Sequence, residues 1–154
     1  MKQRSGEQDS QSLLAPRFRP VGSGSADLSA GVSELSPRDL AYVGDAVFEL
    51  AVRQHLVGRC SSPGERHRDA VRRVRAGAQA AFLRGIEPYL APAEEDLVRR
   101  ARNFKGAAVP RGSTPAEYRA STAFEALLGY LYLRGESGRL QGILAMVLER
   151  TDAP

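Results

Sequence analysis

Two carboxylates stand out because each interrupts a mostly apolar run. Asp45 lies in the run LAYVGDAVFEL, and Glu125 is the only charged residue in the run AFEALLGYLYL. Each acid also has a glycine close by, since Gly44 immediately precedes Asp45 and Gly129 follows Glu125 by four residues. An ionised carboxylate is costly to bury unless a cation or hydrogen-bond donors compensate it. The repeated pattern therefore indicates that the two acids share one cation site.

The two glycines predict how the acids would meet. Glycine inside a helix costs about 0.5–1 kcal/mol relative to alanine, so Gly44 and Gly129 are expected to have a compensating role. A close crossing of the two helix backbones would provide that role and would bring both acids within reach of one ion. Oxygen ligands with no His or Cys pair nearby favour Mg²⁺, or Mn²⁺ as a substitute, over Zn²⁺. In the structural alternative, each acid pairs with a buried arginine or tyrosine.

Positive charge is concentrated in two segments of the chain. The formal net charge is only +4, but arginines crowd residues 66–84 and residues 99–119, where few acids accompany them. Clustered guanidinium groups offer several planar donors to phosphate and favour a nucleic acid as the partner. The alternative is a pair of solvated helix faces that bind nothing.

Local sequence signals predict helices. Ser36 as N-cap and Pro37 in the first turn begin a helix that Gly58 stops after Val57. Apolar periodicity and the glycines and prolines between segments predict further helices over residues 65–84, 93–104, 115–133 and 140–149. No run alternates polar and apolar residues as a half-buried strand would. The expected fold is all-α.

Helical periodicity also predicts which side chains face the core. In the first helix the apolar stripe comprises Leu40, Val43, Val47 and Leu50. In the second helix the inward residues are Ala70, Val71, Val74, Ala78, Ala81 and Phe82. Asp45 and Glu49 lie one turn apart on another face of the first helix, and Glu49 is expected to pair with Arg53.

The chain length favours one domain with a tail. Residues 1–32 are rich in Ser, Gly, Gln and Arg, and we expect a disordered tail there, followed by one domain over residues 33–150. No apolar stretch is long enough to cross a bilayer, and the polar start lacks the apolar segment of a signal peptide. Cys60 is the only cysteine, so an intramolecular disulfide is impossible. A cytoplasmic location is expected.

Both acid-bearing runs resemble the signatures of a known family. The run LAYVGDAVFE resembles the signature of the ribonuclease III superfamily, and more closely that of its Mini form, which lacks a separate double-stranded-RNA-binding domain. The run YRASTAFEALLGYLYL, which ends at Leu133, resembles the second signature of that form. The run RARN and the alanine-rich residues 72–80 match as well. The resemblance covers roughly Leu35 to Leu148 with two motifs in the right order.

One departure from full-length ribonuclease III is informative. That enzyme has further acids one turn before the positions of Asp45 and Glu125, whereas Ala41 and Thr122 stand there in this sequence. The Mini form shares this reduction. Two protein ligands per subunit remain, so water and RNA phosphate must complete the coordination of the ion, which Mg²⁺ tolerates well. The number of ions per site stays open.

The resemblance implies a metal-dependent endoribonuclease. A homodimer would carry two equivalent sites and cleave both strands of double-stranded RNA, with 5′-phosphate and 3′-hydroxyl products. Asp45 and Glu125 would be catalytic and would hold Mg²⁺. The natural substrate of the family is precursor 23S ribosomal RNA, which is matured during assembly of the large ribosomal subunit. The residues expected to bind RNA are Arg99, Arg100, Arg102, Asn103, Lys105, Arg111, Tyr118, Arg119 and Thr122.

Other readings of the same residues stay open. Thr122 could orient a metal-bound water, touch a phosphate, or serve as an ordinary hydroxyl near a helix start. The chain could be a catalytically inactive RNA-binding module of the same fold, or a purely structural helical dimer. His55, His67 and Cys60 have no neighbours at catalytic or metal-ligand spacing, so none of them is given a role.

Overall fold

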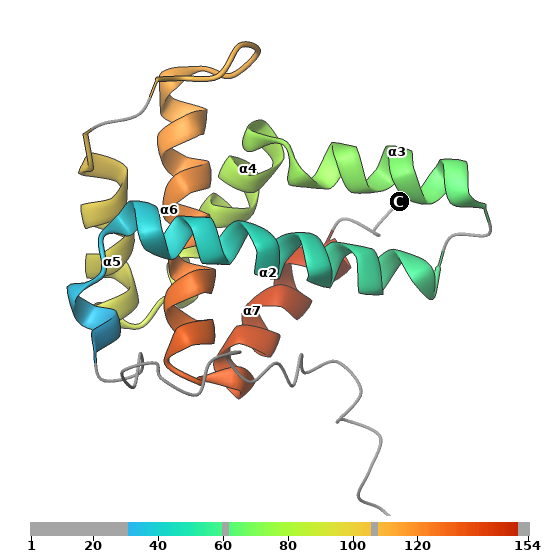
Figure 1. Ribbon diagram of the computed structural model, residues 1–154. Helices are drawn as coiled ribbons and strands as arrows, with labels where there is room; N and C mark the ends of the chain where they lie inside the picture. Colours follow the sequence, from blue (N-terminus) through green and yellow to red (C-terminus); the bar gives the residue numbers. More distant parts are fainter. Residues whose placement is uncertain (1–30, 60–61, 106–107, 151–154) are drawn as a thin grey trace, which may run out of the picture.

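The computed structural model describes residues 31–59, 62–105 and 108–150 (Figure 1). These residues form helices and contain no strand, which confirms the all-α fold. Residues 1–30 of the tail expected over residues 1–32, and Cys60, lie outside the described residues. The elements in chain order are η1 (Val32–Glu34), α2 (Pro37–Val57), α3 (Pro63–Val74), α4 (Ala76–Ile86), η2 (Glu87–Tyr89), α5 (Pro92–Asn103), α6 (Pro115–Leu133) and α7 (Ser137–Arg150).

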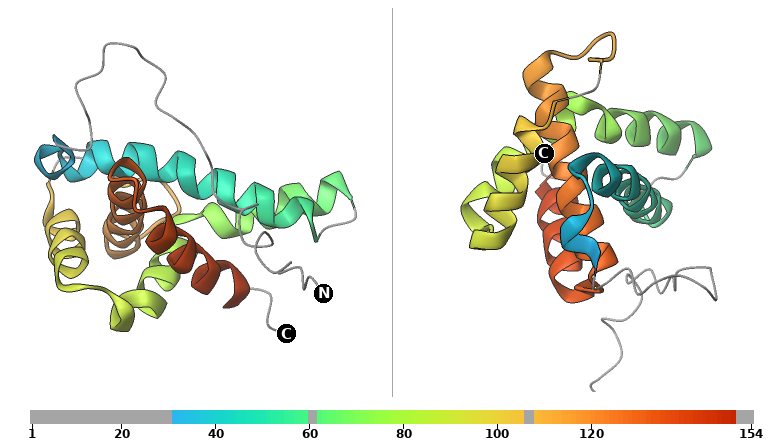
Figure 2. Two further views of the ribbon diagram at one scale, coloured as in Figure 1. Left: turned by 90° about the horizontal axis from the view of Figure 1, so that it is seen from below. Right: turned by 60° about the vertical axis from the view of Figure 1, so that its left-hand side comes forward.

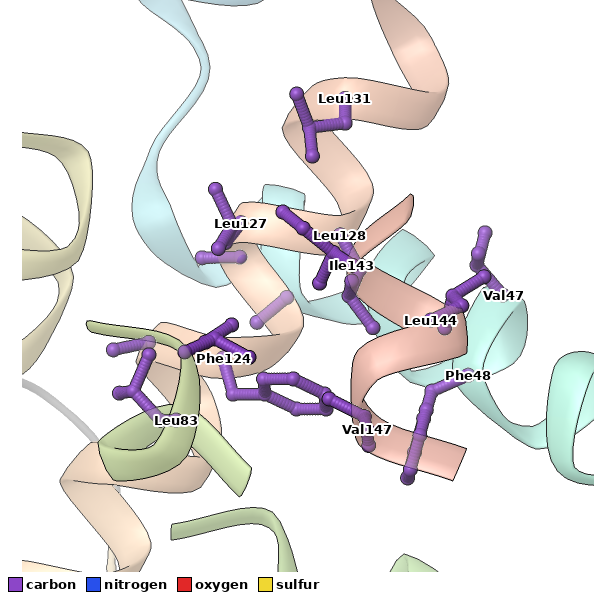
Figure 3. Packing of buried hydrophobic residues seen from close by; sticks show 14 of the residues in the cluster. Val47, Phe48, Leu83, Phe124, Leu127, Leu128, Leu131, Ile143, Leu144 and Val147 are labelled. Carbon is purple, nitrogen blue, oxygen red and sulfur yellow. The ribbon is translucent and has the colours of Figure 1, made fainter. Parts of the chain in front are cut away.

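Helix α6 is the centre of the molecule. It packs against α2, α4, α5 and α7, and α2 crosses it (Figures 1 and 2). Most of its residues are buried because small and large apolar side chains surround it on nearly every side. Phe124 of α6 makes an edge-to-face contact with Phe48 of α2, with ring centroids 5.1 Å apart. Side chains from α2, α4 and α7 converge on this part of α6 (Figure 3).

The predicted starts of α2 and α6 are confirmed by their caps. The Ser36 hydroxyl accepts from the Asp39 amide at 3.2 Å, and a proline occupies the first turn. Thr114 caps α6 in the same way, and the Glu117 carboxylate accepts from the Thr114 amide at 2.9 Å. Such reciprocal caps satisfy the amides that a helix start leaves without partners. Both acid-bearing helices are therefore fixed at their first turns by local sequence.

The single helix expected over residues 65–84 is wrong, because the chain breaks at Arg75. Arg75 is extended, with φ −66° and ψ 149°, and separates α3 from α4. The buried Arg73 donates to the Leu148 carbonyl of α7 at 3.5 Å, and the Gln79 side chain donates to the Val74 carbonyl at 2.9 Å. These contacts support a change of direction that lets α3 lie along α2 while α4 packs on α6 (Figure 1).

The break also changes which residues face the core. Val71 is 54% exposed and Ala81 is exposed, contrary to the sequence expectation, whereas Ala80 and Leu83 are buried. A periodicity that starts in α3 does not continue into α4, because the helix restarts after Arg75 with a new orientation.

Two further expectations need correction. Leu50 of α2 is 37% exposed, and the neighbouring Phe48 and Val52 take its place in the core. Helix α7 begins at Ser137 rather than at Leu140. The turn before it is made by Gly135, whose positive φ of 71° ends α6.

Helix α5 is anchored to α7 by a buried ion pair. The Glu94 carboxylate accepts two hydrogen bonds from the Arg139 guanidinium, at 2.8 and 2.7 Å, and the hydrogen bonds from Arg139 lower the pKa of Glu94. A two-pronged pair of this kind fixes geometry as well as charge. No helix among the described ranges has the length and apolar character needed to span a bilayer.

Candidate active site

The two glycines mark a direct contact between the α2 and α6 backbones. A Cβ atom placed at Gly44 would overlap the Glu125 carbonyl oxygen and lie 2.9 Å from the Gly129 nitrogen. A Cβ atom placed at Gly129 would overlap the Leu40 carbonyl oxygen and lie 3.0 Å from the Gly44 nitrogen. No side chain fits at either position, so the close crossing expected from the sequence is confirmed.

This crossing brings Asp45 and Glu125 within electrostatic range of each other. Glu125 is largely buried, and its burial together with the negative charge of Asp45 raises the pKa of Glu125 to about 7. Burial and the charge of Glu49 raise the pKa of Asp45 as well. In residues 31–59, 62–105 and 108–150, neither carboxylate forms an ion pair with an arginine or lysine. The structural alternative, in which a buried guanidinium neutralises each acid, is therefore not what the structure shows.

These residues fit a hard divalent cation. Asp45 and Glu125 repel each other and have no cationic partner among the described residues. A divalent cation that binds both carboxylates would remove this repulsion. The buried Gln79 side chain contacts Glu125, and its Oε1 atom has no hydrogen-bond partner. In the described part of the chain, no group of three or more His, Cys, Asp or Glu side chains is placed to hold a metal ion. Glu49 pairs with Arg53 at 2.8 Å, as expected.

A pocket of about 500 Å³ opens near the first turns of α2 and α6, the two helices that carry the acids. It lies between the first turn of α2, the end of α5, the loop that follows α5, and the first turns of α6. We call it the basic pocket. Its polar and aromatic lining consists of Arg38, Arg102, Asn103, Phe104, Lys105, Tyr118, Arg119 and Thr122. Thr122 lies one turn before Glu125, so the pocket and the Glu125 carboxylate lie on adjacent turns of α6.

Six of the nine residues expected to bind RNA line the basic pocket. The other three, Arg99, Arg100 and Arg111, lie elsewhere. Arg99 and Arg100 both pair with Asp96, the latter at 3.0 Å, and Arg99 lines a neighbouring groove that shares Arg102 and Asn103 with the basic pocket. Arg111 is exposed on the loop after α5 and lines neither the basic pocket nor that groove.

Sequence reasoning missed Arg38. It stands outside the two basic segments of the sequence, yet its side chain lines the basic pocket. A usable signal was present, because Arg38 precedes Asp45 by seven residues and so lies two turns away on the same helix face.

Thr122 makes a hydrogen bond that narrows its possible roles. Its hydroxyl donates to the Tyr118 carbonyl at 3.0 Å. A hydroxyl has one proton to donate, so in this arrangement Thr122 can accept a hydrogen bond from water but cannot donate one to phosphate. The geometry favours water orientation, or a purely helical role, over phosphate contact.

Comparison with known proteins assigns the chain to a family. The model of the ribonuclease III domain matches residues 38–136. This chain belongs to the ribonuclease III domain family. The matched span includes both carboxylates, the two crossing glycines and the whole basic pocket. The family assignment makes the chain an endoribonuclease.

Individual relatives extend the comparison. The chain is 50% identical to a Mini-ribonuclease 3 of Symbiobacterium thermophilum over 111 residues, which is 71% of this chain and 85% of that protein. It is 44% identical over 120 residues to a Mini-ribonuclease 3 of Thermoanaerobacter, covering 77% and 84% of the two chains. A crystal structure of a Fusobacterium nucleatum protein is similar, with a TM-score of 0.71 and 27% identity, over 78% of this chain and 97% of that one.

Proposed function

We propose that this endoribonuclease hydrolyses backbone phosphodiesters of double-stranded RNA and depends on a divalent cation. The observation that carries the proposal is the crossing at Gly44 and Gly129, which brings together two carboxylates that have no cationic partner among the described residues, near a basic pocket. The products would carry 5′-phosphate and 3′-hydroxyl ends.

Asp45 and Glu125 would hold Mg²⁺, with Mn²⁺ as a substitute. When bound, Mg²⁺ supplies Lewis-acid polarisation of a phosphate oxygen and activation of water. Glu125 must give up its proton to act as a ligand, since a protonated carboxyl group binds cations poorly. Burial limits the access of bulk water to Glu125, which strengthens the interaction of this carboxylate with a cation, whereas Asp45 is exposed.

The basic pocket would bind the RNA backbone. Lys105 and Arg119 present donors suited to phosphate, and Arg102 adds those guanidinium donors that its ion pair with Glu87 does not use. Asn103 and Tyr118 would contact sugar hydroxyls. Proteins recognise double-stranded RNA mostly through its phosphates and 2′-hydroxyls rather than its bases. Binding is therefore expected to show weak sequence selectivity and strong salt dependence.

We propose that two copies of the chain form the active enzyme. Apolar side chains remain exposed along α2 and α3, which contact each other and extend together beyond one side of the fold (Figure 1). They are Tyr42, Leu50, Val57 and Val71. A second copy covering this surface would bring two sites to one duplex, so that both strands could be cut. Precursor 23S ribosomal RNA is the proposed substrate, and the cytoplasm the proposed location.

A cleavage assay on long double-stranded RNA tests the proposal. The wild-type protein should cut the RNA with Mg²⁺ and leave it intact when EDTA removes the metal. Asp45→Asn should reduce cleavage on the order of 1000-fold, because metal stabilisation of the transition state contributes several kcal/mol. The matched control is Glu49→Gln, which removes a neighbouring carboxylate that pairs with Arg53 and should cut at nearly the wild-type rate. Binding without cutting by the wild type would instead support an inactive RNA-binding module.

A further inference from the structure

Gln79 is a buried polar residue that the proposed chemistry leaves without a role. It lies on the first turns of α4, and its side chain is only 1% exposed. Its backbone amide donates to the Arg75 carbonyl at 3.1 Å, which closes the first turn of α4 after the break. A buried amide side chain normally has a specific partner for each of its polar atoms, so the partners of Gln79 indicate what it does.

The Gln79 amide group donates to two acceptors on different helices. Its Nε2 atom donates to the Val74 carbonyl at the end of α3, at 2.9 Å. Its side chain also hydrogen-bonds Glu125 in the middle of α6, and this bond favours the ionised carboxylate. A primary amide nitrogen has two protons, which is the number these two acceptors need. A carbonyl and an ionised carboxylate can only accept, so the nitrogen faces both of them, and among the described residues the buried Oε1 has no hydrogen-bond partner.

We propose that Gln79 is a positioning residue that holds the Glu125 carboxylate in the orientation required for metal binding. The proposal rests on the proposed metal site. One amide proton fixes Gln79 itself to the end of α3, and the other orients the carboxylate. Hydrogen-bond partners of metal-binding carboxylates orient them and raise metal affinity in this way.

This role gives a function to the break at Arg75. In one continuous helix over residues 65–84, the Val74 carbonyl would be taken up by the helix's own hydrogen bonds. The break frees that carbonyl and directs α4 onto α6. Gln79 can therefore hold the end of α3 and reach Glu125 at the same time.

The test measures Mn²⁺ binding to the RNA-free protein by electron paramagnetic resonance of the free ion, below the unfolding temperature. Gln79→Met fills a similar volume without a donor and is expected to weaken Mn²⁺ binding by about 10-fold or more. The Mg²⁺ concentration for half-maximal RNA cleavage should rise in parallel. Asp45→Ala should abolish binding at this site.

Ser121→Ala is the matched structural control. Ser121 is buried on α6, and its hydroxyl donates to the Tyr118 carbonyl at 2.9 Å. Its loss removes a buried hydrogen bond on the helix of Glu125 without removing a donor to that carboxylate. This variant should lose some thermal stability and keep wild-type Mn²⁺ affinity.

The outcomes separate the inference from the proposed function. A folded Gln79→Met that binds Mn²⁺ as tightly as the wild type would overturn the positioning role and leave Gln79 as a cap for α3. If Gln79→Met does not fold, Gln79→Asn is used in its place, because the shorter side chain of asparagine cannot reach both acceptors. An unchanged Mn²⁺ affinity of Gln79→Asn would also refute the positioning role. Failure of the wild type to bind Mn²⁺, or wild-type binding by Asp45→Ala, would overturn the metal site and the inference with it.

Discussion

The Glu125 carboxylate is in an unfavourable position for an ionised group when no cation is present. Burial and the nearby charge of Asp45 raise its pKa to about 7, although the Gln79 amide acts in the opposite direction. A cation at the crossing would reverse this effect, because it favours the ionised form of both acids. Metal binding and proton release at Glu125 are therefore expected to be coupled.

The stability of the metal-free protein should fall as pH rises. The folded chain keeps the Glu125 proton to about pH 7, whereas an ordinary glutamate loses it near 4.5. Between these two pH values only the folded state holds the proton, so the free energy of unfolding decreases as pH rises. The decrease is about 1.4 kcal/mol per pH unit and roughly 3 kcal/mol in total. Above pH 7 the free energy of unfolding no longer changes through this group. Glu125→Gln should lack this decrease. Urea unfolding in EDTA from pH 5 to pH 8 tests it, and identical pH profiles for variant and wild type would refute it.

The crossing of α2 and α6 is the element-scale feature on which the site depends. This crossing could be predicted from the sequence, because Gly44 lies beside Asp45 and Gly129 lies four residues after Glu125. Helix geometry then predicts the helix face on which each glycine lies. The contact itself places the Gly44 position against the Glu125 carbonyl. Any atom added there must separate the helices that bring the acids together.

Gly44→Ala should therefore disrupt both stability and cleavage. The added methyl group would overlap backbone atoms that cannot rotate away, and overpacking of this kind costs about 1–3 kcal/mol or more. The matched control is Gly142→Ala in α7, where nothing lies within 4 Å of the added atom; it should stabilise the protein by about 0.5–1 kcal/mol. Thermal unfolding measures both, and wild-type stability and activity in Gly44→Ala would contradict this account of the crossing.

Helix starts could be predicted from sequence, whereas the break between α3 and α4 could not. Ser36 and Thr114 cap their helices through residues three positions away, so the signal is local. The break at Arg75 depends on contacts with distant segments, since Arg73 reaches the Leu148 carbonyl of α7 and α4 must pack on α6. Local propensity over residues 65–84 favours a continuous helix, and tertiary packing overrides it.

At the scale of the whole molecule, the basic pocket assembles residues from three helices and a loop. Sequence clustering identified Arg102, Lys105 and Arg119, because each lies in a visibly basic segment. It missed Arg38, which stands alone in the sequence and joins the others only through packing. It also included Arg99 and Arg100, which pair with Asp96 away from this pocket. Charge clustering in a sequence does not reveal local ion pairs of this kind.

Arg38→Ala and Arg119→Ala should each weaken binding to double-stranded RNA. Loss of one phosphate contact is expected to reduce the slope of log affinity against log salt by about 1. Arg134→Ala is the matched control, because Arg134 follows the opposite end of α6 and pairs with Glu136 at 2.9 Å. Fluorescence anisotropy over a salt series with metal-free protein measures the slopes, and equal slopes in all three variants would contradict the assignment of the pocket.

The proposed dimer predicts a solution mass near twice the 16.7 kDa of the chain. Leu50→Lys places a charge on the exposed apolar face of α2 and should shift the equilibrium towards monomer while leaving helix content unchanged, since Leu50 is outside the core. Sedimentation equilibrium measures both proteins. A wild-type monomer that still cuts both strands of one duplex would contradict the paired-site arrangement.

A crystal of the protein grown with Mn²⁺ at about pH 8, above the pKa of Glu125, tests the central claim most directly. Anomalous scattering should place an ion at the α2–α6 crossing, with carboxylate oxygens of both Asp45 and Glu125 as ligands. The account would be contradicted by an active protein whose crystals show no ion there, or show Mn²⁺ bound to other side chains while these two carboxylates stay apart.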